Sequence, residues 1–388
     1  MLLRLITILA LVAPETGPKE AAVVAPGANQ PHLAASDDGA FYATFIKDGN
    51  IGFSCSTDKG RTWSAPVVAI DALGRGSGGM QRGPRIAVDG KKTIYITAPL
   101  TFDETELNGK KYPVRDLFLA VSTDGGKTFS KPVQINDVPK KAPESLHWLA
   151  AAPNGDVFAV WLDLRQRDKG QDLGYVKISD QGKKIGKNGL LPGPLCECCA
   201  PGLAVDSKGN PLVLYREGGK VNRSIFLGIS TNGGASFSKI NRINTGETKI
   251  DACPMDAPQV AVSRDGSKIA TAWMDFRAGS NLRHVQWTIG SGGKFSPETS
   301  ASDDAKGGQG HPSLAFDAEG AAWCAWEDTR RGINAQGIFA ADSKSRKNVA
   351  ISSETEGKCG YPTLAFGAGT MGVIYEAGTT VAFRLIGP

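Results

Sequence analysis

The stretch P-S-L-A-F-D-A-E-G at Pro312–Gly320 contains the unit that decides the fold: a proline slot, any residue, an aliphatic residue, alanine, and then an acidic or polar turn with glycine. Further strand-like runs follow the units, for example V-F-A-V-W at 157–161 and D-L-F-L-A-V-S at 116–122. The copies lie 50 to 63 residues apart, and a strand repeat of this length predicts a β-propeller with one blade per repeat. The seven copies begin at Pro31, Pro84, His147, Pro201, Pro258, Pro312 and Pro362.

We therefore predict an all-β fold, a propeller of seven four-stranded blades, with six blades as the alternative. The last unit has only three evident strands, P-T-L-A-F, M-G-V-I-Y-E and T-V-A-F-R-L-I. The run A-A-V-V-A-P at 21–26 resembles a fourth strand, so we expect it to pair into the last blade and close the ring. Residues 21–388 then form a single propeller domain, and residues 1–20 a leader.

Three turns with a common pattern lie between the third and fourth strands of their units. The first reads S-T-D-K-G-R-T-W at Ser56–Trp63, and related turns occupy Ser122–Phe129 and Ser230–Phe237. In this pattern the acidic or amide side chain can accept backbone N–H bonds, glycine allows an unusual φ, and the aromatic residue can pack beneath the turn. The pattern predicts three self-contained turns at equivalent positions of three blades.

With these turns the chain resembles the sialidase, or neuraminidase, superfamily of β-propellers with Asp-box (BNR) repeats. The resemblance covers nearly the whole chain and implies that the Asp boxes are structural and lie on the face opposite the active site. The family has six blades, whereas the repeat here counts seven. W-x-D-x-R also occurs three times, ending at Arg165, Arg277 and Arg330. Either an Asp–Arg pair closes each of these loops, or the loops present Asp and Arg to an anionic ligand.

The resemblance implies a set of catalytic residues for an exo-α-sialidase-like glycoside hydrolase. Tyr361, in C-G-Y-P-T-L-A-F, matches the nucleophile, and Glu197, in L-C-E-C-C, matches the glutamate that activates it. Asp48, on a short hairpin, is the nearest match to the acid/base aspartate. A tyrosine nucleophile suits a substrate carbon that already carries a carboxylate, because a neutral group approaches it more easily than an anion.

The same resemblance implies arginines that bind the sugar carboxylate, which guanidinium suits by its permanent charge and bidentate geometry. Arg216 and either Arg330 or Arg331 match this clamp, and Arg85 is a further candidate from blade two. Blade one departs from the family, since Q-P-H-L stands where an Arg-Ile-Pro strand is expected. The sequence leaves a catalytic and a non-catalytic function open, with a glycan or another anionic small ligand as the partner.

Cysteine, histidine and methionine residues gather around the proline slots. If the loops there converge on the channel mouth, thiolates and imidazoles could bind copper or zinc, which makes a metal-binding or disulfide-stapled module the alternative function; otherwise no cofactor is expected. In an oxidising compartment neighbouring cysteines usually join, so we predict a disulfide between the loops leading into blades four and five, and no metal in its presence. The residues concerned are Cys196, Cys198, Cys199, Cys253, Met255, His147 and His311.

Composition excludes several classes of protein. The net charge of +5 is spread without a dense Lys/Arg tract, which argues against nucleic acid as a partner. Residues 1–13 place one basic residue before a short apolar run that resembles a signal peptide and is too short to span a bilayer. We expect a secreted or periplasmic monomer without a membrane span.

Overall fold

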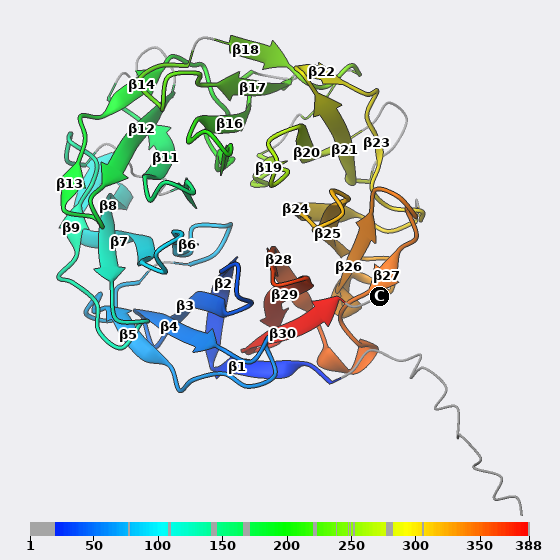
Figure 1. Cartoon of the computed structure of the whole chain (residues 1–388), viewed down its shortest axis with the longest axis horizontal. Coiled ribbons are helices and arrows are strands. Elements are labelled where there is room, and N and C mark those ends of the chain that lie inside the picture. Colours follow the sequence, from blue (N-terminus) through cyan, green and yellow to red (C-terminus); the bar gives the residue numbers. More distant parts are fainter. Residues whose placement is uncertain are drawn as a thin grey trace, which may run out of the picture.

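The computed structural model describes residues 20–386 except 77, 108–109, 141–145, 166–170, 220–222, 238, 247, 249, 251–252, 277–281 and 305. Seven antiparallel sheets stand around a central axis like the blades of a fan (Figure 1). The prediction of an all-β, seven-bladed propeller is confirmed, and the six-bladed alternative is wrong. The predicted leader lies outside the described residues. No helix among the described residues has the length and apolarity to cross a membrane.

Each blade follows the sequence outward from the axis, with the first strand innermost. Blade one contains β2 (Ala28–Ala35), β3 (Phe41–Lys47), β4 (Asn50–Ser56) and β5 (Val67–Ile70). Blade two contains β6 (Arg85–Val88), β7 (Ile94–Leu107), β8 (Lys110–Ser122) and β9 (Val133–Gln134). Blade three contains β10 (His147–Ala151), β11 (Val157–Asp163), β12 (Asp172–Ser179) and β13 (Lys184–Ile185), with β14 (Gly189–Leu191) also on β12.

The remaining blades repeat this order. Blade four contains β15 (Gly202–Val205), β16 (Pro211–Arg216), β17 (Ile225–Ile229) and β18 (Lys239–Arg242). Blade five contains β19 (Gln259–Val262), β20 (Lys268–Asp275), β21 (His284–Ser291) and β22 (Lys294–Phe295), with β23 (Thr299–Ser300) on β21. Blade six contains β24 (Gln309–Phe316), β25 (Ala322–Asp328), β26 (Gly337–Asp342) and β27 (Val349–Ala350). Blade seven contains β28 (Cys359–Gly367), β29 (Thr370–Ala377) and β30 (Thr380–Ile386).

The ring closes where its two ends meet. β1 (Ala22–Pro26) pairs antiparallel with β30 and supplies the outer strand of blade seven. The predicted closure by residues 21–26 is therefore confirmed, and the last sheet is completed by the first strand of the chain. β1 covers the outer edge of β30, so the first and last strands of the chain are held in one sheet.

Strand register defines two faces of the ring. In blade one Ala28, at the start of the inner strand, pairs with Lys47, which pairs with Asn50; at the other end Ala35 pairs with Phe41, which pairs with Ser56. The face at which inner strands begin is called the mouth face below, and the opposite face the turn face. Since the Ser56–Trp63 turn follows β4, it belongs to the turn face.

The turn at Ser56–Trp63 is held by bonds within its own eight residues. Asp58 Oδ1 accepts from Ser56 Oγ at 2.8 Å and from the Thr62 N–H at 2.9 Å, and Asp58 Oδ2 accepts from Thr62 Oγ1 at 2.6 Å. Gly60, at φ 82°, lies directly against the Phe383 ring of the preceding blade. Trp63 packs on the same ring, with centroids 5.1 Å apart. The turn thus joins blade one to blade seven.

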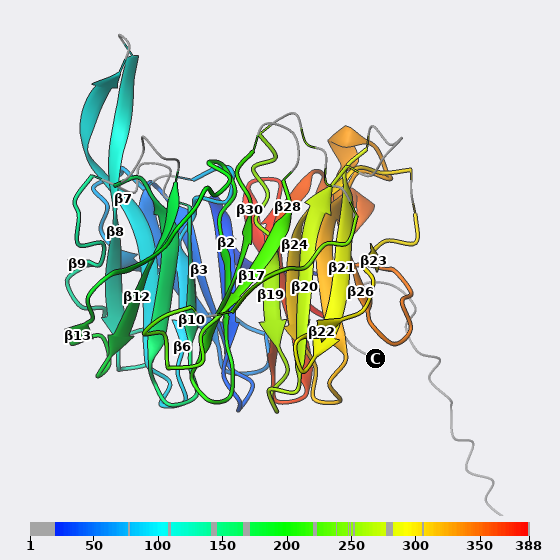
Figure 2. The same cartoon turned by 90° about the horizontal axis from the view of Figure 1, so that it is seen from above.

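A long hairpin rises from the mouth face beside the ring. β7 and β8 pair from Ile94 with Ser122 to Leu107 with Lys110, well beyond the start of the inner strand β6, and the hairpin stands above the other blades (Figure 2). The Lys140–Asp103 ion pair, at 2.5 Å, ties its base to the loop that follows β9. The hairpin therefore forms a wall on one side of the mouth face.

Candidate functional site at the mouth of the ring

Three inner strands bulge at their third residue. Gln30 in β2, His311 in β24 and Tyr361 in β28 each sit at a shift in register, with φ of 52°, 48° and 52°. Proline follows each of them, and because proline has no N–H the pairing with the second strand is interrupted there. Non-glycine residues in this left-handed conformation are strained, and such strain clusters at functional sites.

A carboxylate from the preceding blade accepts the backbone N–H of each bulged residue. The acceptors belong to blades five, six and seven, and the bulged residues to blades six, seven and one, so the bonds link four consecutive blades around the mouth. The three bonds are His311 N to Asp256 Oδ2 (2.6 Å), Tyr361 N to Glu327 Oε1 (2.7 Å) and Gln30 N to Glu376 Oε1 (2.6 Å).

The centre of this network is the pair His311 and Glu327, whose side chains are 13% and 9% exposed. His311 Nδ1 lies 2.8 Å from Glu327 Oε1, and Nε2 lies 3.2 Å from the carbonyl oxygen of Met255. Both ring nitrogens face acceptors, which favours the doubly protonated imidazolium. Burial lowers the pKa of His311, but the charges of Glu327 and Asp256 outweigh it and raise the pKa to about 9. Burial likewise opposes the charge on Glu327, but His311 holds the pKa of that carboxyl below its usual range.

Tyr361 lines a hollow of about 510 Å³ on the mouth face. Its ring packs against the His311 ring at 4.9 Å, and its hydroxyl accepts the Met80 N–H at 3.3 Å. Burial, and then the charge of Glu327, raise the pKa of the phenol, and burial raises the pKa of Glu376. The hollow is lined by Asn29, Gln30, Ile46, Gly49, Gly76, Gly78, Gly79, Tyr361 and Glu376.

The loop from blade one to blade two reaches across the mouth. Gln81 Oε1 accepts the Ala257 N–H of the loop into blade five at 2.8 Å, and Gly83 N–H donates to Gln30 Oε1 at 3.2 Å. The buried Arg85 donates to the Gln81 carbonyl at 2.6 Å and stacks over the Trp148 ring at 4.5 Å. Arg85, predicted to bind substrate, thus lies beneath the loop and holds it in place.

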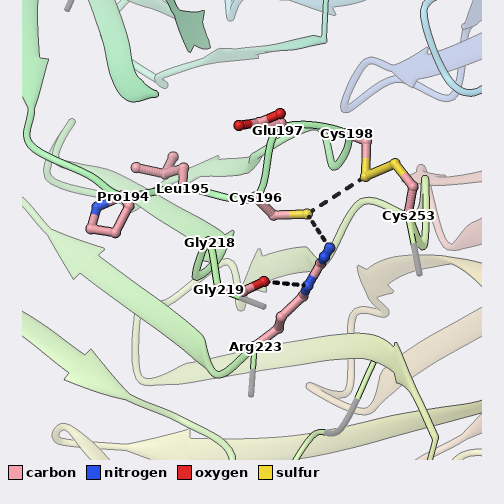
Figure 3. A pocket seen from close by; sticks show the side chains of 9 residues that line it. All are labelled: Pro194, Leu195, Cys196, Glu197, Cys198, Gly218, Gly219, Arg223 and Cys253. Carbon is pink, nitrogen blue, oxygen red and sulfur yellow. Dashed lines mark hydrogen bonds between the residues drawn. A yellow bond between two sulfur atoms is a disulfide. The ribbon is translucent and has the colours of Figure 1, made fainter. Parts of the chain in front are cut away.

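Glu197, predicted to activate Tyr361, lines a different hollow. This second hollow, of about 550 Å³, is called the cysteine hollow (Figure 3). Glu197 is exposed there, whereas the carboxylates near Tyr361 are Glu327 and Glu376. The cysteine hollow is lined by Pro194, Leu195, Cys196, Glu197, Cys198, Gly218, Gly219, Arg223 and Cys253.

The other predicted clamp arginines bind groups of the protein. Arg216 is 1% exposed and donates to the Met274 carbonyl at 2.6 Å. Arg330 Nη2 lies 2.8 Å from Asp328 Oδ2, and Arg331 Nη1 donates to the Ser352 carbonyl at 3.0 Å. No arginine is among the described residues that line the Tyr361 hollow.

Asp48 occupies the turn between β3 and β4, on the mouth face. Its side chain is 82% exposed and lies 4.0 Å from the Lys47 ammonium. The next residue, Gly49, lines the Tyr361 hollow. Asp48 is therefore at the rim of this hollow, and its predicted acid/base role stays a prediction.

Two of the W-x-D-x-R loops are closed by an internal Asp–Arg pair. Arg165 Nη2 lies 2.9 Å from Asp163 Oδ2, in the arrangement that Arg330 and Asp328 also adopt. The indole of Trp161 donates to the same Asp163 carboxylate at 3.0 Å. Arg277, in the third copy, lies outside the described residues. In these two loops the Asp–Arg pair closes the loop, as one of the two interpretations proposed.

The predicted disulfide between the loops into blades four and five is present. Cys198 and Cys253 are joined with Cα atoms 6.2 Å apart. The predicted alternative metal ligands are not gathered in one place: His147 Nε2 is 3.1 Å from Thr97 Oγ1, and His311 pairs with Glu327. Cys196, Cys198 and Cys199 do have sulfur atoms within 4.8 Å of one another.

Glu327, Glu376, Gln30 and Asp256 were not predicted from the sequence. Glu327 pairs with Gly310 in register, and Glu376 pairs with Gly360 in the same place of the next blade. Both glutamates follow a buried aromatic residue at the end of strand two, in W-E-D and Y-E-A. This shared position in two blades is the sequence pattern from which the two glutamates could have been predicted as site residues.

No protein-family model matches this chain, and no curated protein matches it. Among solved structures it is similar to a PL25 ulvan lyase (TM-score 0.55, 13% identity, 94% of this chain and 95% of that one). It is also similar to the intramolecular trans-sialidase from Ruminococcus gnavus (TM-score 0.51, 15% identity, 83% and 92%). The chain spans 65% of the Hadza microbial sialidase Hz136, with 92% of its own length aligned, at 17% identity and a TM-score of 0.46. These likenesses concern the fold.

Proposed function

We propose that this propeller acts on a glycan bound in the Tyr361 hollow. The observation that carries the proposal is that a half-buried phenol, a carboxyl group and two side-chain amides line one hollow on the mouth face. Its volume of about 510 Å³ falls in the range of small-ligand sites. Amide, carboxyl and backbone groups that line one hollow can form hydrogen bonds with the hydroxyls of a sugar. The similar folds of the ulvan lyase and the trans-sialidase support the same class of ligand.

The chemistry we propose is cleavage of a glycosidic linkage by Tyr361 and Glu376. Because burial raises the pKa of Glu376, this carboxyl retains its proton closer to neutral pH than an exposed one. Glu376 can donate this proton to the leaving oxygen and, as the carboxylate so formed, accept the proton of the Tyr361 phenol as its oxygen attacks the sugar. Water would then break the tyrosine–sugar bond and return a proton to the phenol. We assign to Glu376 the role predicted for Glu197, since Glu197 lines the other hollow.

A more specific form of this proposal is that the substrate is a sialic acid glycoside. It requires a cationic clamp for the sugar carboxylate, and the matching arginines Arg216, Arg330 and Arg331 all bind protein groups. A substrate recognised through hydroxyls therefore fits the Tyr361 hollow better than one recognised through a carboxylate. We also propose a secreted or periplasmic location and a monomer, the former because a disulfide persists in an oxidising compartment.

The experiment compares wild type with Tyr361→Phe, Glu376→Gln and Glu197→Gln on fluorogenic glycosides, including a sialoside, and on acidic and neutral polysaccharides. Turnover should fall at least ~100-fold in the Tyr361 and Glu376 variants, as for loss of an acid/base or nucleophilic group, and hold in Glu197→Gln. Equal loss in Glu197→Gln would contradict the assignment to the Tyr361 hollow. If no glycan is bound or cleaved by the wild type, the proposal is wrong.

A further inference from the structure

Three cysteines line the cysteine hollow, and a fourth, Cys199, contacts one of them; two of the four are free. Cys198 and Cys253 form the disulfide, while Cys196 and Cys199 are thiols with Sγ atoms 3.1 Å apart. Cys196 Sγ is also 3.7 Å from Cys198 Sγ of the disulfide (Figure 3). One thiol therefore contacts both another thiol and a disulfide. Cys196 and Cys199 have the C-x-x-C spacing that is typical of redox-active pairs.

The backbone fixes Cys196 in this position. Its N–H donates to the Arg216 carbonyl at 2.9 Å, and the preceding Leu195 bridges to Glu217, just beyond β16. Cys253 reaches the cluster from the loop into blade five. The four sulfurs therefore meet between two blades, independently of the Tyr361 hollow.

Charge and burial make the two free thiols unequal. Arg223 Nη1 lies 3.4 Å from Cys196 Sγ. A guanidinium this close favours the thiolate of Cys196, whereas Cys199 is 4% exposed. A thiolate at the hollow and a buried thiol behind it are the two members that thiol–disulfide exchange needs.

We propose that the cysteine hollow is a thiol–disulfide exchange site in which the Cys196/Cys199 dithiol and the Cys198–Cys253 disulfide interconvert. In the first step the Cys196 thiolate attacks Cys198 Sγ, the Cys198–Cys253 bond breaks, and Cys253 leaves as a thiolate that takes a proton. In the second step the Cys199 thiol loses its proton and attacks Cys196 Sγ, and Cys198 leaves as a thiolate that takes up a proton. One disulfide and two thiols are present before and after, so no external oxidant or reductant is consumed.

The exchange changes how the two blades are connected. The Cys198–Cys253 bond joins segments 55 residues apart in the sequence, whereas a Cys196–Cys199 bond closes only a short local loop. The loop into blade five is then released from the loop that carries Glu197. The hollow between them therefore has a cross-linked and an open form.

Disulfide mapping of the full-length protein tests this proposal. The protein is incubated at pH 8, acid-quenched, blocked with N-ethylmaleimide and digested without reduction for mass spectrometry. Wild type should contain both Cys198–Cys253 and Cys196–Cys199 pairs. Cys199→Ser should accumulate the Cys196–Cys198 intermediate, because its resolving thiol is missing, and Cys196→Ser should contain Cys198–Cys253 alone. Cys55→Ser, which removes a free cysteine in blade one, is the matched control and should resemble wild type.

Two results would overturn the proposal. The first is Cys198–Cys253 as the sole pairing in wild type. The second is four reduced cysteines together with stoichiometric zinc or copper in the purified protein, which would make the cluster a metal site instead. Both can be read from wild type, so they hold even if a cysteine variant does not fold. Neither depends on glycan turnover.

Discussion

The two faces of the ring are built from bonds of very different range. On the turn face Asp58 bonds to Ser56 and Thr62, two and four residues away. On the mouth face Gln81 bonds to Ala257 across 176 residues, and Gln30 to Glu376 across 346. The hydrogen bonds within the Asp58 turn therefore depend on a short stretch of sequence. Those of the mouth face can form only once the ring has closed. A change in the turn face should affect stability, and a change in the mouth face should affect function as well.

The largest expected effect is on the turn face, at Gly126. This glycine has φ 87°, and a Cβ placed on it would lie 2.1 Å from the Phe53 ring of the preceding blade. Gly126→Ala should lower the free energy of unfolding by about 2–5 kcal/mol, from the left-handed backbone and the overpacking together. The loss is measured by urea unfolding of wild type and variant.

The neighbouring Gly125 provides the matched control. It also has a positive φ, 77°, but no atom lies within 4 Å of a Cβ placed on it. Gly125→Ala should therefore cost only the backbone strain, about 1–2 kcal/mol. If the two variants lose the same free energy of unfolding, then contact with the Phe53 ring of the preceding blade is not the reason why a glycine is required at position 126.

The same contrast explains what the sequence could predict. The turns, the seven blades and the closing strand follow from patterns a few residues long, such as P-S-L-A and S-T-D-G-G-K-T-F. The disulfide could be predicted because the loops into adjacent blades must lie side by side. The carboxylates that accept from Tyr361 and Gln30 belong to neighbouring blades, and their bonds depend on bulges that the strand pattern does not reveal. Glu197 was assigned by family pattern alone, and the fold places it in the other hollow.

A smaller effect is expected on the mouth face at Glu327. Glu327→Gln leaves the buried His311 without its anionic partner and should lower the free energy of unfolding by about 3 kcal/mol at pH 7, in line with the breaking of buried ion pairs. Asp38→Asn breaks the exposed Lys92–Asp38 pair of 2.5 Å instead. This control should cost less than about 1 kcal/mol.

The pH dependence sharpens the test at Glu327. The pKa of His311 is about 9 in the folded protein and about 6.5 in the unfolded chain. The folded state thus holds the extra proton between these values, so stability is complete below pH 6.5 and is lost as the pH rises through 9. Asp256, which also faces His311, adds to this charge interaction. Thermal unfolding from pH 6.5 to 9.5 should show this loss in wild type and Asp38→Asn, and a flatter profile in Glu327→Gln. If stability falls with pH as steeply in Glu327→Gln as in wild type, the His311–Glu327 pair is not the origin of the pH dependence.

The smallest expected effect is the acid sensitivity of the exposed turns. Bonds from Thr62 and Ser56 lower the pKa of Asp58 to about 2, against about 3.9 in an unfolded chain. The stability that these bonds add is present above pH 3.9 and is lost as the pH falls through 2. In the third turn Asn232 replaces the aspartate and accepts the Ser236 N–H at 3.0 Å without an ionisable group. Asp58→Asn should therefore make acid unfolding between pH 4 and 2 less steep, and Asn232→Asp should make it steeper. Circular dichroism along an acid titration measures both slopes, and a change of the same sign in the two variants would show that the charge of the turn is not what responds to acid.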